Sequence, residues 1–274
     1  MTNTAAPEIR LPNDFTVVVT RPSEQAENLC RMIDAAGGRA MRLPLLAIEP
    51  LGADGAVRLA QAANVDWLVF VSANAVRYGL EHIPAGSRPR VAAIGEATRA
   101  ALERRGWTVD LAPKEQFNSE VLLSQPEWAE MSGQRVLIVR GEGGRELLAD
   151  TLRTRGAEVE YAEVYRRVRP ALELTEFIAW ISDGAKGAIT ITSGDALDHL
   201  AQALDAPTLE RIAEVPMVVV SERLAERARS LGFRCPVVAE TASDRAVFDA
   251  VADISFRARG VFPPISTLRG YSLG

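Results

Sequence analysis

Small polar residues stand at the ends of several apolar runs, each directly before a stretch with helical periodicity. Their hydroxyl groups and the free N–H groups of helix starts can bind anions, and simple helix capping is the alternative. These residues are Ser72, Thr98 (which follows Gly95), Ser193, Gly194 and Ser221, with Asn118 at a further helix start. Because ligands of doubly wound sheets lie outside the carboxyl ends of the strands, the set predicts a site for a small polyanion.

Two arginines, Arg21 and Arg140, end strands that occupy equivalent places in the two halves of the chain. A guanidinium group binds a carboxylate through two parallel hydrogen bonds, so both arginines are candidate substrate ligands. A surface ion pair within the protein is the alternative interpretation of each.

The turn GEGG at 141–144 follows an apolar strand and precedes a helix. Such a turn can direct backbone amides at an anion, so Gly141 and Gly143 are candidate binding residues. The match to a dinucleotide-binding loop is only partial, because Glu146 stands where a third glycine is required.

Few side chains of the chain could act as acids or bases. Tyr165, in the extended run EVYRRV, could donate a proton to a ligand, and a half-buried structural tyrosine is the alternative. His82 and His199 lie late in helical runs and are interpreted as surface or packing residues. The absence of acid–base pairs in the strand-end loops argues against ordinary hydrolysis.

Composition narrows the classes of partner. The 274 residues carry a formal net charge of −5, whereas general nucleic-acid binders are usually basic, so we expect no nucleic-acid partner. The two cysteines and two histidines show no spacing typical of a metal or redox site, and we expect no metal. The N-terminal stretch has no apolar signal segment, and the run WLVFV at 67–71 is too short to cross a bilayer. We therefore expect a cytoplasmic protein that makes no membrane contact. We also expect a monomer.

Short apolar runs alternate with amphipathic stretches along the chain, as in α/β folds with parallel sheets covered on both faces. The predicted strands are TVVVT at 16–20, WLVFVS at 67–72, RVAAIG at 90–95, RVLIVRG at 135–141, AITITS at 188–193 and MVVVS at 217–221. Each is followed by a predicted helix. The chain therefore has the elements of a doubly wound α/β protein.

The two halves of the chain resemble each other. Residues 16–50 parallel 135–170, 69–80 parallel 189–200, and 91–109 parallel 217–235, which suggests an internal duplication. The runs that end at Pro50 and Pro170 have no helix immediately after them, which is typical of crossings between two lobes, and they could pair as an antiparallel ribbon.

A domain plan follows from these crossings. Residues 14–40 and 172–254 would form one discontinuous lobe, 53–157 the second lobe, and 41–52 with 158–171 the connecting ladder. Residues 255–274 would form a flexible tail. A simple division near residue 130 is the alternative.

Several of these segments together carry a resemblance to a known family. They are VVVTRP with Gln25, GGRAMRLPLLAIEP, WLVFVSANAV, VAAIGEATRAALERRGW, the helix start at 118–120, LIVRGEGGRELLADTLRTRGAEVEYAEVYRR, ITITSGDAL and VVVSERLAERARSLGF. In this order and spacing, over about residues 14–254, the chain resembles the uroporphyrinogen-III synthase family.

The resemblance implies two flavodoxin-like, doubly wound lobes with parallel sheets, joined by a two-stranded antiparallel β ladder. It implies cyclisation of hydroxymethylbilane to uroporphyrinogen III with loss of water and inversion of ring D, a hydro-lyase reaction of heme biosynthesis without metal or organic cofactor. The substrate carries eight carboxylates, held in the family largely by backbone amides.

The resemblance also assigns roles to residues. Tyr165 matches a tyrosine that assists departure of the hydroxyl, Thr98 matches a threonine of a post-strand loop, and Ser72 and Ser193 match polar positions that face the ligand. The family often has a threonine where this chain reads Ser221-Glu222-Arg223. Two other functions stay open: a non-catalytic two-lobed binding module for an anionic metabolite, and a nucleotide-dependent enzyme that uses the turn at 141–144.

Overall fold

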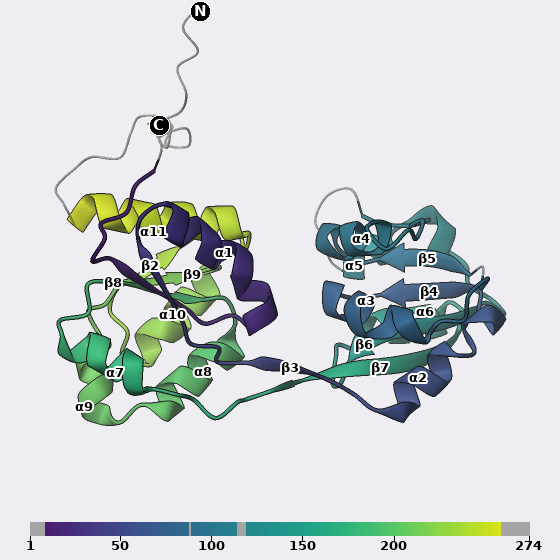
Figure 1. The fold of residues 1–274 in the computed structure, drawn as a ribbon. Coiled ribbons are helices and arrows are strands. Elements are labelled where there is room, and N and C mark those ends of the chain that lie inside the picture. Colours follow the sequence, from purple (N-terminus) through teal and green to yellow (C-terminus); the bar gives the residue numbers. More distant parts are fainter. Residues whose placement is uncertain (1–8, 88, 114–118, 259–274) are drawn as a thin grey trace, which may run out of the picture. The chain divides into compact units, whose positions relative to one another are not determined.

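The structure is a computed structural model that describes residues 9–87, 89–113 and 119–258. The chain divides into two compact units, one within Met1–Ala47 and Arg169–Gly274 and the other within Ile48–Val168. Each unit contains a five-stranded sheet covered by helices (Figure 1). Every pairing whose register is known is parallel, which confirms the predicted doubly wound α/β class.

The first unit has the strand order β10-β9-β8-β1-β2. Its strands are β1 (Thr16–Val19), β2 (Arg39–Arg42), β8 (Gly187–Ile191), β9 (Met217–Val219) and β10 (Pro236–Val238). Its helices are α1 (Ser23–Ala35), α7 (Thr175–Ser182), α8 (Gly194–Ala203), α9 (Ala206–Ile212), α10 (Glu222–Ser230) and α11 (Asp244–Ala258). Because strand side chains alternate between faces, Val18 packs in one core with α7 to α10, and Val17 and Val19 pack in the other with α1 and α11.

The second unit has the strand order β3-β7-β6-β4-β5. Its strands are β3 (Ala47–Pro50), β4 (Trp67–Phe70), β5 (Arg90–Ala93), β6 (Arg135–Gly141) and β7 (Glu158–Val168). Its helices are α2 (Ala53–Leu59), α3 (Ala73–Gly79), α4 (Glu96–Glu103), α5 (Ser119–Leu123) and α6 (Leu147–Thr154), with short 3-10 turns η1 (Ala62–Asn64), η2 (Leu80–His82) and η3 (Pro126–Trp128). Here too, Leu68 and Phe70 join one core and Trp67 and Val69 the other.

The segments 41–52 and 158–171, expected to connect the lobes, contribute β3 and β7, which are neighbours in the second sheet. β7 also pairs along its length with β6, and the division between the units falls after Ala47 and after Val168. The start of the expected flexible tail is helical in the structure. Helix α11 continues through residues 255–258, because Ser255 is buried and Phe256 packs on the core shared with α1. The rest of the expected tail, 259–274, lies outside the described residues.

The two sheets repeat one arrangement of strands. β1 lies between β2 and β8 with β9 beyond, and β6 lies between β7 and β4 with β5 beyond. These are the strands that the sequence comparison pairs, so the internal similarity has a structural counterpart. Within the described part of the chain, no helix is both long and apolar enough to cross a membrane.

Candidate functional site

Tyr165 is positioned by a bulge at the carboxyl end of the second sheet. β6 and β7 pair in regular parallel register up to Arg140 opposite Glu163, and then Gly141 lies opposite Tyr165. The extra residue on β7 turns Tyr165 onto the face that Val139 shares, as bulges do when they redirect a side chain. A Cβ atom at Gly141 would lie 2.6 Å from two atoms of the Tyr165 ring, so only glycine leaves room for the ring.

Ser72 fixes the other end of the tyrosine. It is the N-cap of α3 and accepts a hydrogen bond from the Ala75 backbone N–H at 3.1 Å. Its Oγ also lies 3.0 Å from the phenolic oxygen of Tyr165, whose side chain is buried and packs beside Tyr78. A serine hydroxyl has one hydrogen and two lone pairs, so Ser72 can accept from Ala75 and donate to Tyr165 at once. The phenol proton is then free for a ligand.

Both residues border a pocket of about 420 Å³ within the second unit. Polar and charged groups that line it include Ser72, Ser119, Gly143, Arg145, Tyr165 and Arg167. The phenol therefore sits in a cavity large enough for part of a small molecule, which is the setting that an acid or base requires.

Arg140 lines the same pocket, but the protein's own carboxylates already bind it. Its side chain is 6% exposed and lies 3.0 Å from Glu146 and 3.2 Å from Glu163, with its guanidinium over the Tyr161 ring. Tyr161 donates a hydrogen bond to Glu146. The bonds from Tyr161 and then Arg140 lower the pKa of Glu146, and burial followed by the bond to Glu146 raises the pKa of Tyr161. This network supports the turn at 141–144 from beneath, since a Cβ at Gly144 would lie 3.3 Å from the Arg140 Nε.

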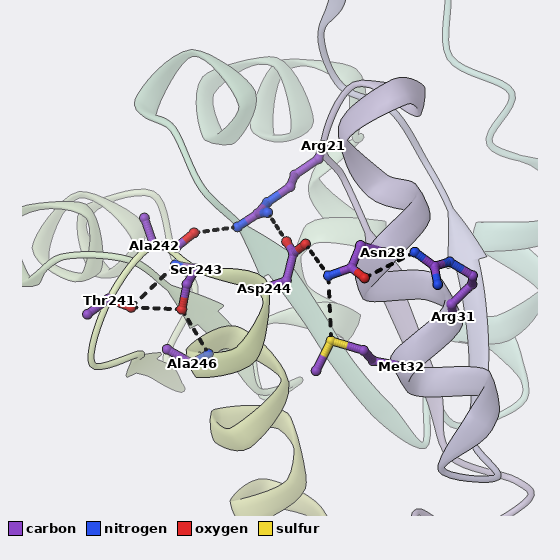
Figure 2. A network of polar contacts seen from close by, with 9 residues as sticks. All are labelled: Arg21, Asn28, Arg31, Met32, Thr241, Ala242, Ser243, Asp244 and Ala246. Atoms are coloured by element: carbon purple, nitrogen blue, oxygen red, sulfur yellow. Dashed lines mark hydrogen bonds and ion pairs between the residues drawn. The ribbon is translucent and has the colours of Figure 1, made fainter. Parts of the chain in front are cut away.

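Arg21 occupies the equivalent place in the first unit and is also engaged within the protein (Figure 2). Its guanidinium pairs with Asp244 at the start of α11 and donates to the Ala242 carbonyl at 2.8 Å. The second carboxylate oxygen of Asp244 accepts from Asn28 of α1 at 2.8 Å. This network links the end of β1 to α1 and α11.

The remaining predicted residues of the first unit cap helices. Ser193 accepts from the Ala196 N–H at 3.2 Å, and Ser221 accepts from the Leu224 N–H at 3.3 Å. Both border a second pocket, of about 710 Å³, together with Gly194 and other residues of that edge.

Two of the predicted site residues, Thr98 and Asn118, are not among the residues that the structure places at these two pockets. Thr98 is buried within α4 and does not line the pocket of Tyr165. Asn118 lies outside the described residues.

Among the described residues, no group of three or more His, Cys, Asp and Glu side chains could hold a metal ion. His199 contacts the Leu45 carbonyl at 2.7 Å, in line with a packing role.

Comparison with known proteins decides the family. The sequence model described as "Uroporphyrinogen-III synthase HemD" matches residues 27–249. The chain belongs to the uroporphyrinogen-III synthase family. It is 34% identical over 246 residues to the uroporphyrinogen-III synthase of Escherichia coli, a match that covers 86% of this chain and 100% of that protein. The Salmonella typhimurium enzyme is also 34% identical, over 249 residues, with the same coverage.

Solved structures of this family share the fold. The uroporphyrinogen-III synthetase of Helicobacter pylori superposes with a TM-score of 0.59 at 16% identity, covering 88% of this chain and 99% of that chain. A mutant uroporphyrinogen III synthase of Thermus thermophilus gives 0.58 at 18% identity, covering 89% and 99%. These similarities support the two-unit α/β architecture.

Sequence reasoning did not identify two arginines of the pocket, Arg145 and Arg167. Signals for both were present: Arg145 directly follows the glycine turn, and Arg167 lies two residues after Tyr165 on one strand. Residues two apart on a strand share a face, so a basic residue there belongs with the tyrosine. Sequence reasoning also missed that Gly141 makes room for Tyr165.

Proposed function

We propose that this chain cyclises hydroxymethylbilane to uroporphyrinogen III, with loss of water and inversion of ring D, and so acts as a hydro-lyase of tetrapyrrole biosynthesis. The observation that carries the proposal is the 34% identity to the Escherichia coli enzyme along that enzyme's whole length. The pocket around Tyr165 adds a chemical reason, because it presents a phenol and cationic groups to a ligand.

Tyr165 is the proposed proton donor. When the terminal hydroxyl of the linear tetrapyrrole leaves, it needs a proton to depart as water, and a positioned phenol supplies one. With Ser72 as donor in the 3.0 Å contact between the two hydroxyls, the Tyr165 proton is available to the ligand and the phenolate that forms is stabilised. The substituted carbon of ring D then attacks the cationic azafulvene and forms a spiro intermediate. The bond from that carbon to the methylene of ring C breaks, and the methylene, now part of a second azafulvene, is attacked by the other α-carbon of ring D, which loses its proton. The macrocycle is then closed with ring D inverted.

Positioning contributes most of the proposed catalysis. The substrate closes spontaneously to the uninverted isomer, so the enzyme must hold ring D where the more difficult attack becomes the faster one. Backbone amides at helix starts and arginine side chains are suited to this task, because the substrate's acetate and propionate groups are anionic. Ser72, Ser193, Gly194 and Ser221 stand at those helix starts.

The test is to incubate the protein with freshly prepared hydroxymethylbilane, oxidise the products and separate the uroporphyrin isomers by chromatography. We expect predominantly isomer III, formed faster than the spontaneous reaction. Isomer I alone, at the rate without enzyme and with folded protein, would refute the proposed activity.

A further inference from the structure

The positive charge of this chain is carried almost entirely by arginine, because Lys114 and Lys186 are its only lysines. Most described arginines make ion pairs or hydrogen bonds within the protein. Arg21 and Arg140, the two with the most direct sequence argument for substrate contact, are among them. A guanidinium that is already paired with a carboxylate of the protein is a poor ligand for a second carboxylate, since its charge is already compensated.

Arg145 and Arg167 differ from those two. Both are exposed, both line the pocket that contains Tyr165 and Ser72, and neither side chain has a hydrogen-bonding or ionic partner among the residues described. They come from separate elements, Arg145 from the segment between the glycine turn and α6, and Arg167 from the end of β7. Two uncompensated cations therefore border one cavity next to a buried phenol.

The backbone of the adjoining turn supports the same kind of ligand. The Glu142 N–H donates to the Tyr165 carbonyl at 2.8 Å, whereas that of Gly143 has no acceptor within the described part of the chain. Gly143 has a φ of +69°, which favours glycine and gives the turn its tight bend. A free amide beside two unpaired guanidinium groups forms a site for carboxylates.

We propose that Arg145 and Arg167 bind carboxylate side chains of the tetrapyrrole in the pocket of Tyr165 and supply binding energy for the substrate there. This inference rests on the proposed function and names residues of that site. Arg140 is then a positioning residue that supports the turn from beneath, and Arg145 and Arg167 are the side chains that contact the ligand. Glu142 borders the same pocket with the opposite charge, and it weakens carboxylate binding there.

The experiment compares Arg145→Gln, Arg167→Gln and Glu142→Gln with a matched control, Arg104→Gln. Arg104 caps α4 in the same unit and does not line this pocket. With hydroxymethylbilane as substrate, we expect KM to rise about 10- to 100-fold for each pocket arginine, the effect of losing a charge-assisted hydrogen bond. We expect kcat to change little, Glu142→Gln to lower KM, and Arg104→Gln to match the wild type. Circular dichroism and thermal melting check that each variant is folded.

A binding measurement separates this inference from the proposed activity. Fluorescence titration with uroporphyrin III, which has eight carboxylates, and with mesoporphyrin, which has two, needs no turnover. We expect the pocket variants to lose affinity for uroporphyrin and to lose less for mesoporphyrin. If wild-type protein forms no isomer III but the variants lose uroporphyrin affinity, the proposed function fails and the carboxylate site stands. If folded Arg145→Gln and Arg167→Gln bind and turn over like Arg104→Gln, the inference is wrong.

Discussion

The carboxyl ends of the two sheets start from similar residues and use them differently. In the first unit, β1 leads through Arg21 and Pro22 directly into α1, and Arg21 ties α11 to that edge. In the second unit, β6 leads through Arg140 into a glycine turn before α6 begins at Leu147. Both arginines are neutralised by carboxylates, but among the described residues only the second edge also contains a buried phenol with a hydroxyl partner.

The neighbouring strand explains the difference. β2 pairs with β1 over four residues without a break in register, whereas β7 runs past the end of β6 and carries a bulge there. The bulge directs Tyr165 over Gly141 and toward Ser72. A shared strand order thus produces a capped, structural edge in one unit and a pocket suited to chemistry in the other.

Removing the phenolic hydroxyl should have the largest effect. We expect Tyr165→Phe to lower kcat for uroporphyrinogen III about 100-fold, the usual contribution of a general acid, while the retained ring keeps its packing beside Tyr78. Tyr78→Phe is the matched control, because the Tyr78 hydroxyl makes only a 3.4 Å contact with the Ile48 carbonyl. Initial rates of isomer III formation measure both. Equal rates for the two variants would exclude Tyr165 as the acid, and a complete loss in Tyr165→Phe would make it obligatory.

Filling the space beneath the ring tests the bulge itself. Gly141→Ala places a Cβ 2.6 Å from the Tyr165 ring, so the ring must move. A displacement of about 1 Å can lower a rate about 100-fold, and we expect a loss approaching that of Tyr165→Phe. The control is Gly52→Ala, where a Cβ meets nothing within 4 Å. If the rate of folded Gly141→Ala matches that of Gly52→Ala, the position of Tyr165 over Gly141 does not matter for activity.

Ser72 and Ser193 provide a matched pair across the two edges. Each caps a helix through its Oγ, and replacing either with alanine should destabilise the protein by about 1 kcal/mol. Only Ser72 also contacts Tyr165, so we expect Ser72→Ala to lower kcat about 10-fold beyond any loss in Ser193→Ala. Ser72→Thr should restore most of the rate, because it keeps the hydroxyl. Urea denaturation and kcat together measure both effects. If both alanine variants lose stability and activity equally, Ser72 acts only as a cap.

The sequence was sufficient to predict the parallel sheets and the serine caps, because apolar strands followed directly by Ser and a helix are local signals. The bulge was not predictable, because it depends on the register between β6 and β7, two strands set by tertiary pairing. The partners of Arg21 and Arg140 were hidden for a related reason. Asp244 is 223 residues from Arg21 in the sequence, so the sequence does not show that the two side chains meet. The positive charge of Arg21 alone therefore suggested that it binds a substrate carboxylate, whereas the fold pairs it with a carboxylate of the protein.

The smallest expected effect concerns how the stability of the second unit depends on pH. In the second unit, hydrogen bonds from Tyr161 and then Arg140 lower the pKa of Glu146 in the folded protein. A carboxyl group with a lowered folded pKa stabilises the fold above its unfolded pKa, about 4.3, and this contribution is lost as the pH falls through the folded value. We therefore expect Glu146→Gln to flatten the decline of the urea midpoint below about pH 4.3 and to leave the slope near neutral pH unchanged. Glu142→Gln, on the same turn, is the control, because its side chain has no partner among the described residues. An equal flattening in both variants would show that Glu146 does not link the glycine turn to β7 through the Arg140 network.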